Sequence, residues 1–211
     1  MIFKLHHTDM SFPNPALAEE DGLLAIGGDL CTERLLLAYN SGIFPWYGED
    51  EPICWYAPHE RCVIFPGKIY VSSSMEKLLR QKKVTITTDT VFDRVIAACK
   101  NIERKDQPGT WITDEMEAAY IKLHRAGIAH SIEVWKDGEL AGGMYGLRIN
   151  NVFCGESMFS KIRNASKAAM IWLCRSGHYD LIDCQVPNQH LMSMGAEMIS
   201  REAYMKLLHR E

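Results

Sequence analysis

The sequence predicts an α+β fold: a small N-terminal α/β domain, then a larger domain in which helices flank a mainly antiparallel sheet. Two turn signals predict the sheet. Asp137–Gly138 is a strong two-residue hairpin signal and Asn150–Asn151 a weaker one, so the stretch over 130–160 divides into three antiparallel strands. Near residue 60, a segment rich in proline, glycine and aromatic residues gives way to regular strand and helix signals. This change predicts two domains, over 1–60 and 61–211.

The N-terminal part is rich in proline, glycine and aromatic residues. A short apolar strand is expected at 23–28. The segment "TERLLLAYNSG" predicts a helix with Thr32 as its N-cap and Gly42 as its stop. The segment over 43–61 has no helical period and places aromatic residues near its prolines, which is unusual for a mere linker.

Strand and helix signals follow one another along the larger domain. Thr113 is the expected N-cap of one helix, with acidic residues in the first turn and Gly127 as its stop. Besides the three strands over 130–160, strands are expected at 62–66, 84–89, 181–185 and 197–200, and helices at 72–83, 91–103, 113–127, 164–177, 188–195 and the C-terminus.

The composition is that of an ordinary globular protein. The chain has 211 residues, of which 47% are apolar and 24% charged. Its formal net charge of -4 means that any contact with nucleic acid requires a local basic patch. The seven cysteines form no CxxC pair, which predicts reduced, packed thiols.

Signals for targeting and for metal binding are absent from the sequence. The N-terminal stretch lacks a charged segment followed by an apolar one, and no apolar run approaches the ~18 residues of a membrane helix. The histidines form neither HxxxH nor HxH. We therefore expect a cytoplasmic protein without a membrane span, a metal or another cofactor.

The stretch "LIDCQ" (181–185) poses the sharpest chemical question. An apolar run of this length between two helices predicts a buried strand, and alternation places Asp183 and Gln185 on one face of it. An ionised Asp in a core is costly unless it is paired. Asp183 therefore either pairs with an arginine or caps a helix, or it faces a reacting centre together with Gln185.

Four stretches, in this order and near this spacing, resemble the leucyl/phenylalanyl-tRNA–protein transferase family. They are "GGDL…LLLAYNSGIFPWY" (27–47), "GTWIT" (109–113), "HSIEVW…ELAGGMYG" with "FCGESMFS" and "NASK" (130–167), and "LIDCQ". The resemblance covers most of the chain. It implies a GNAT-like acyltransferase domain, and the predicted order of a meander, a helix and a further strand is laid out in the same way.

The resemblance also implies a reaction. The family moves Leu, Phe or Met from an aminoacyl-tRNA to the N-terminal amine of a protein that begins with Arg or Lys, which marks that protein for degradation. GNAT enzymes hold the coenzyme A pyrophosphate on a glycine-rich turn, whereas "SKIRNASK" (160–167) has no glycine. A coenzyme A-dependent N-acyltransferase and a non-catalytic binder of tRNA ends or basic N-termini are the alternatives.

The resemblance maps Asp183 and Gln185 onto the family's proposed catalytic pair, in which Asp orients Gln and the Gln carbonyl oxygen accepts a hydrogen bond from the attacking amine. A carboxylate is a poorer base than an α-amine by about four pKa units. The pair is therefore expected to position the amine and to stabilise the charge that it gains.

Glu156 is a candidate for binding the cationic acceptor terminus, with an ion pair as the alternative. By alternation it shares a strand face with Cys154 and Met158. The resemblance favours Trp46 and Trp111 as stacking platforms for a base or ribose, although a lone aromatic is more often core. Tyr120 is a weaker candidate of the same kind, with core packing as its alternative.

The donor side chain is expected to contact methionines and aromatic residues near the catalytic strand. Methionines fill irregular gaps, so such a lining accepts Leu, Phe and Met, and branching at Cβ would exclude Ile and Val. Alternation places Phe153 on the opposite strand face from Met158. The candidates are Met144, Phe153, Met158 and Trp172.

Three basic runs are candidates for contact with the tRNA backbone, although such runs usually form a solvated face. The run that we favour contains Lys77, Arg80, Lys82 and Lys83. The others contain Lys100, Arg104 and Lys105, and Lys161 and Arg163.

Overall fold

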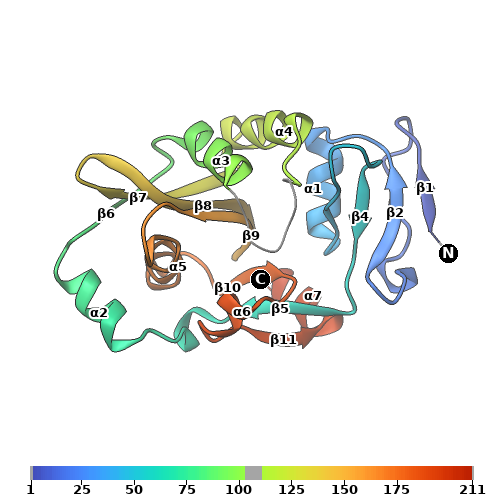
Figure 1. Ribbon diagram of the computed structural model, residues 1–211. Coiled ribbons are helices and arrows are strands. Elements are labelled where there is room, and N and C mark those ends of the chain that lie inside the picture. Colours follow the sequence, from blue (N-terminus) through green and yellow to red (C-terminus); the bar gives the residue numbers. More distant parts are fainter. Residues whose placement is uncertain (1, 103–110, 211) are drawn as a thin grey trace.

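The computed structural model describes residues 2–102 and 111–210, which form two sheets with helices around them (Figure 1). The predicted α+β class is confirmed. The smaller sheet has the order β1-β2-β4-β3, with β1 parallel to β2 and the other pairs antiparallel. Its strands are β1 (Phe3–Leu5), β2 (Leu23–Gly27), β3 (Phe44–Pro45) and β4 (Cys54–Tyr56).

Helix α1 (Thr32–Asn40) connects β2 to β3. The expected N-cap is wrong by one residue, because Cys31 holds that position and no side chain caps the helix. The chain turns back after α1 at Gly42, whose φ of 71° glycine adopts without strain. This turn leads into β3, which lines the pocket described below.

The larger sheet has seven strands in the order β11-β5-β10-β9-β8-β7-β6. The predicted meander is confirmed, with left-handed residues in both of its turns, at Asp137, Gly138 and Asn150. β10 is parallel to β9, while the other neighbours are antiparallel. The strands are β5 (Glu60–Ile64), β6 (Thr85–Thr88), β7 (Ala129–Lys136), β8 (Glu139–Ile149), β9 (Val152–Ser160), β10 (Leu181–Gln185) and β11 (Glu197–Ser200).

Helices cover both faces of the larger sheet. Figure 1 shows α3 and α4 above it and α5 below it. Thr113 caps α4 as expected, since its side chain accepts a hydrogen bond from the Met116 amide. The remaining bounds are η1 (Pro15–Leu17), η2 (Pro66–Lys68), α2 (Ser73–Arg80), α3 (Phe92–Asn101), α4 (Asp114–Arg125), α5 (Ala165–Arg175), α6 (Gln189–Met192) and α7 (Arg201–Leu208).

Two apolar cores result from this arrangement. The first core joins the two sheets, because Trp55 and Tyr39 of the N-terminal part pack in one cluster with Tyr120 and Tyr145. The second core surrounds α5 on the opposite face of the larger sheet. The smaller sheet ends with Tyr56 and the larger begins with β5 at Glu60; the domain boundary near residue 60 stays a prediction.

The parallel pair β9–β10 separates part-way along its length. Register holds through Leu181–Val152, Ile182–Phe153 and Asp183–Cys154, after which β9 continues to Ser160 without β10 beside it. On its other side, β10 has an irregularity against β5 between Asp183 and Gln185. Backbone groups and side chains at this separation are therefore available to a cleft instead of a ladder.

Candidate active site

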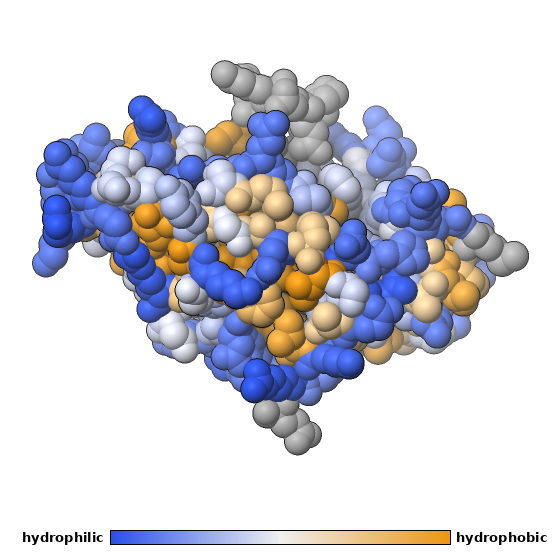
Figure 2. Space-filling model, turned by 90° about the horizontal axis from the view of Figure 1, so that it is seen from below, coloured by the Kyte–Doolittle hydropathy of each residue, from blue (hydrophilic) through white to orange (hydrophobic). Residues whose placement is uncertain are grey.

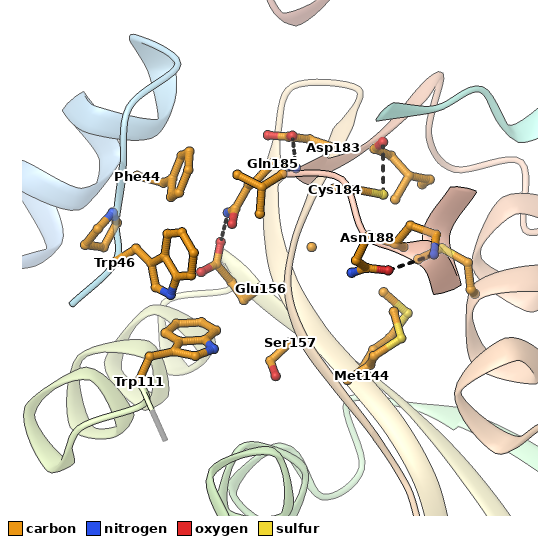
Figure 3. A pocket seen from close by; sticks show the side chains of 17 residues that line it. Phe44, Trp46, Trp111, Met144, Glu156, Ser157, Asp183, Cys184, Gln185 and Asn188 are labelled. Atoms are coloured by element: carbon orange, nitrogen blue, oxygen red, sulfur yellow. Dashed lines mark hydrogen bonds between the residues drawn. The ribbon is translucent and has the colours of Figure 1, made fainter. Parts of the chain in front are cut away.

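A pocket of about 260 Å³ lies where β9 and β10 separate (Figure 3). Its lining divides by chemistry into two sides. We call Trp46, Trp111, Glu156, Asp183 and Gln185 the polar wall, and Met144, Met158, Met170, Ile182 and Leu191 the apolar wall. Cys184 and Asn188 also line it, together with Phe44 and Pro45 of β3.

Asp183 is fully buried, and its charge is paired. Arg61 of β5 binds both of its carboxylate oxygens, each at 2.9 Å, and the Tyr204 hydroxyl donates to Oδ2 at 2.9 Å. Arg61 in turn lies between the rings of Phe44 and Tyr204, 4.7 Å from each centroid. The arginine pairing considered for Asp183 is therefore present, and its bidentate geometry offsets the cost of burying the charge.

The same carboxylate also holds Gln185. The backbone N–H of Gln185 donates to Oδ1 of Asp183 at 2.8 Å, and Gln185 has a left-handed φ of 63° that is unusual for a side chain-bearing residue. Strain of this kind persists where surrounding contacts fix the conformation. Asp183 thus orients Gln185 through its main chain, which is the geometry that positioning by Asp183 requires.

The side chain of Gln185 is held by Glu156. Nε2 of Gln185 donates to Oε1 of Glu156 at 2.9 Å, as Figure 3 shows. The Tyr39 hydroxyl donates to the same oxygen at 2.7 Å and the Tyr120 hydroxyl to Oε2 at 3.0 Å. This network fixes the Gln185 amide with its carbonyl oxygen as the remaining acceptor.

Burial is the largest influence on the Glu156 carboxyl group. It raises the pKa of Glu156 to about 7, against the hydrogen bonds from Tyr39 and Tyr120, which favour the ionised form; the charge of Asp183 raises it further. Burial and the Glu156 carboxylate together raise the pKa of Tyr39 and of Tyr120 well above that of an ordinary tyrosine. Both tyrosines therefore stay protonated as donors.

A β-bulge aims Glu156 at this network. Tyr145 pairs with Ser157 and Gly146 with Gly155, so Glu156 is the extra residue of β9. A Cβ on Gly146 would lie 2.2 Å from the Cys154 carbonyl oxygen, and only glycine fits there. The bulge places the side chain of Glu156 among the first-core tyrosines Tyr39 and Tyr120.

The bulge also corrects the faces expected from alternation. Cys154 belongs to the first core with the partners of Glu156, whereas Met158 packs against the second core. Phe153 is in the second core, on the same side as Met158 and not opposite to it. Simple alternation fails because one extra residue shifts the side-chain period by one.

The structure brings some of the other expected residues to the pocket and leaves others away from it. Trp46 and Trp111 stand close together at its edge, and Trp46 is 36% exposed (Figure 3). Met144 and Met158 line the pocket. Tyr120 lies behind Glu156, while Phe153 packs on Tyr179 and Trp172 on the second core, outside the lining.

The favoured basic run lies on α2 and the turn that follows it. Figure 1 places α2 beyond α5 from the pocket, and Figure 2 shows hydrophilic side chains at that end of the molecule. Lys77, Arg80, Lys82 and Lys83 line no part of the pocket. Of the second run, Arg104 and Lys105 lie outside the described residues, and Lys100 pairs with Asp114 and Glu117.

Sequence reasoning missed Tyr39, Arg61 and Tyr204. Tyr39 lies in an apolar helical segment and has the pattern of a core residue. Arg61 directly precedes the apolar run of β5. A charged residue next to a buried run needs a buried partner, and this is the one local indication of its role. Nothing in the sequence around Tyr204 distinguishes it from other helix residues.

Over residues 2–102 and 111–210, no group of three or more His, Cys, Asp or Glu side chains is placed to hold a metal ion. Within the same ranges, no helix has both the length and the apolar character needed to cross a membrane.

Comparison with known proteins decides the family. A model described as leucyl/phenylalanyl-tRNA protein transferase matches residues 63–209, and the model of its N-terminal domain matches 28–59. The chain belongs to this family. Leucyl/phenylalanyl-tRNA–protein transferases from Desulfatibacillum aliphaticivorans and Flavobacterium johnsoniae are each 52% identical to it, over 94% and 95% of this chain and 87% and 96% of theirs.

The expectation of a transferase, drawn from the ordered motifs, is thereby confirmed. Among solved structures, a GCN5-related N-acetyltransferase from Kribbella flavida covers 75% of this chain and 57% of its own, with a TM-score of 0.41 and 12% identity. That similarity is too low to support an argument. The family match shows that the chain is a transferase. The particular donor and acceptor are inferred below from the chemistry of the site.

Proposed function

We propose that this protein is cytoplasmic and transfers Leu, Phe or Met from an aminoacyl-tRNA to the N-terminal amine of a protein that begins with Arg or Lys. The observation that carries this proposal is the meeting of the two walls at the separation of β9 and β10. An amino-acid ester needs an apolar site for its side chain and polar groups at its carbonyl. The names of the relatives, which are leucyl/phenylalanyl-tRNA–protein transferases, support the same donor.

The reaction is aminolysis of an ester. The acceptor nitrogen attacks the ester carbonyl carbon, an amide bond forms and the carbon–oxygen bond to the ribose breaks. The one proton that the nitrogen loses ends, in the net reaction, on the released ribose hydroxyl. The Gln185 carbonyl oxygen accepts a hydrogen bond from the attacking amine, with the amide side chain held by Glu156 and the main chain by Asp183. Because the ester is already activated, orientation of the amine suffices to lower the barrier by several kcal/mol.

The walls suggest how the donor is seated. The indoles of Trp46 and Trp111 offer stacking surfaces for the terminal adenosine at the pocket edge. The donor side chain would contact the apolar wall, whose methionines adapt to flexible or flat side chains. Glu156 already accepts hydrogen bonds from Gln185, Tyr39 and Tyr120, so positioning Gln185 is a better-supported role for it than binding the acceptor cation.

The test is direct transfer. The protein is incubated with labelled Phe-tRNA and a protein that bears N-terminal Arg, and the same acceptor with N-terminal Gly serves as the control. Label is expected on the Arg acceptor alone. Transfer is expected to continue when the protein has been treated with a chelator. Transfer from an acyl-coenzyme A in place of the tRNA would favour the N-acyltransferase, and donor binding without any transfer would favour the non-catalytic binder.

A further inference from the structure

A second hollow shares part of its framework with the pocket. It is lined by the end of β9, the turn over 161–164, the first turn of α5 and His190 of α6. The same three elements, β9, α5 and α6, supply Met158, Met170 and Leu191 to the pocket. Three elements of the fold therefore contribute to both hollows.

The hollow is strongly basic. Lys161, Arg163 and Lys167 line it, and no Asp or Glu does. The first turn of α5 carries no acidic residue either. Elsewhere in the described chain, cations such as Lys68, Arg61 and Arg175 lie against carboxylates. Three like charges without a counter-charge repel one another and destabilise the folded state. A bound anion would relieve this repulsion.

His190 gives a second and independent indication. Its Nε2 atom is buried and finds no hydrogen-bond partner among residues 2–102 and 111–210. Burial, followed by the nearby charge of Lys167, lowers the pKa of His190, which favours the neutral form of the ring. A buried ring nitrogen without a partner is rare in native proteins and fits a polar ligand in the hollow.

The side chains, more than the helix end, form this site. The Ser166 amide at the start of α5 already donates to Ser160 Oγ at 3.1 Å, and the Ala165 amide donates to the Ile162 carbonyl oxygen at 3.3 Å. The turn contains no glycine, so an anion would contact lysine and arginine side chains instead of a close backbone cradle.

We propose that this hollow binds a backbone phosphate of the donor strand close to its reacting end. The inference rests on the proposed function, because an ester seated in the pocket brings a polyanionic strand to its mouth, with one phosphate for each nucleotide. Contacts of this kind fix the position of the strand and carry no sequence information. They would hold the terminal ester in register with Gln185.

The test compares two triple variants with equal loss of charge. Lys161→Gln, Arg163→Gln and Lys167→Gln are combined in one, and Lys122→Gln, Lys136→Gln and Lys206→Gln in the other, all six being at the surface or half-buried. Binding of uncharged tRNA and of its single-stranded 3′-terminal oligonucleotide is measured from 50 to 300 mM salt, with thermal unfolding as the check on folding. The first variant is expected to bind about tenfold more weakly and to show a salt slope lower by about one, and the second to bind as wild type.

Three outcomes overturn the proposal. Equal binding by the two variants would show that the hollow contacts no strand. Loss of tRNA binding without loss of oligonucleotide binding would place the contact away from the reacting end. Binding of inorganic phosphate that depends on the three residues, with equal oligonucleotide binding by wild type and the first variant, would make the hollow a site for free phosphate. Absence of amino-acid transfer by the wild-type protein would instead remove the proposed function, whatever these binding curves show.

Discussion

The two walls of the pocket differ in how they are built, although β9 and β10 contribute residues to both. The polar wall contains a chain of hydrogen bonds from Asp183 through Gln185 to Glu156, which Arg61 supports from outside the lining, with every distance near 2.9 Å. The apolar wall has three methionines, and its five side chains carry no hydrogen-bonding N or O atom. One wall fixes a group in a single position, and the other adapts to what it contacts.

The difference follows from what each wall has to do. An attacking amine is productive only in a narrow range of positions, and misplacement by 1 Å can lower a rate by about a hundredfold. A donor side chain needs only to be enclosed. Changes in the polar wall are therefore expected to lower stability or activity more than changes in the apolar wall or outside the pocket.

The largest effect is expected at Arg61. Arg61→Ala leaves the buried Asp183 charge unpaired, which lowers the free energy of unfolding by about 3–5 kcal/mol in urea titrations. Arg210→Ala, at an exposed arginine, is the control. The double variant Arg61→Met with Asp183→Leu should recover much of the stability and still lack transfer activity. Wild-type stability in Arg61→Ala would show that Arg61 does not neutralise the buried charge of Asp183.

Glu156 is expected to make stability depend on pH. Its pKa is about 7 in the folded protein and 4.5 as an ordinary Glu, so the folded state holds the proton more tightly. The contribution is complete below pH 4.5 and is lost as the pH rises through 7, a change of about 3 kcal/mol. Unfolding of wild type and of Glu156→Gln is compared from pH 4.5 to pH 8, with the exposed Glu115→Gln as control; a constant difference between wild type and Glu156→Gln would refute the shift.

Gln185 and Asp183 are expected to govern turnover. Gln185→Ala and Asp183→Asn should lower kcat by about a hundredfold and raise the KM for aminoacyl-tRNA much less, because the amine loses its positioning group. The exposed Gln189→Ala is the matched control. A rise in KM with kcat unchanged would transfer both residues to donor binding.

The apolar wall is expected to sort donors by shape, with a smaller effect. Ile has the same atoms as Leu, so rejection must come from branching at Cβ, next to the ester. We expect Leu to be transferred about tenfold faster than Ile or Val, within the 1–3 kcal/mol that such differences contribute. Misacylated tRNAs with one constant body provide the measurement. Equal rates for Leu and Ile would assign the selectivity to the tRNA body.

The smallest effect is expected outside the pocket, in the turn that follows α2. Charge reversal of Lys82 and Lys83 should weaken donor binding for all acceptor-stem sequences alike and lower the salt slope by about one for each lost phosphate contact. Reversal of Lys122 and Lys206 is the control. Wild-type affinity in the Lys82 and Lys83 variant would show that the strand follows another surface.

The sequence alone predicted the elements whose signals are local. The Asp137–Gly138 turn, the Thr113 cap and the buried strand over 181–185 all depend on residues a few positions apart, and all three are present. The ordered motifs likewise identified the family. Thr32 failed as an N-cap because a helix start can shift by one residue without a change in the apolar pattern.

Only the tertiary structure decided how the site is assembled. The bulge at Glu156 depends on the pairing of β8 with β9, and it reversed the face assigned to Phe153. The partners of Asp183 and Glu156 come from Arg61 and Tyr39, which are 122 and 117 positions away in the chain. Local patterns specify that a buried acid needs a partner, because the cost of an unpaired charge is a property of the residue; which residue supplies that partner depends on the packing of strands and helices distant in sequence.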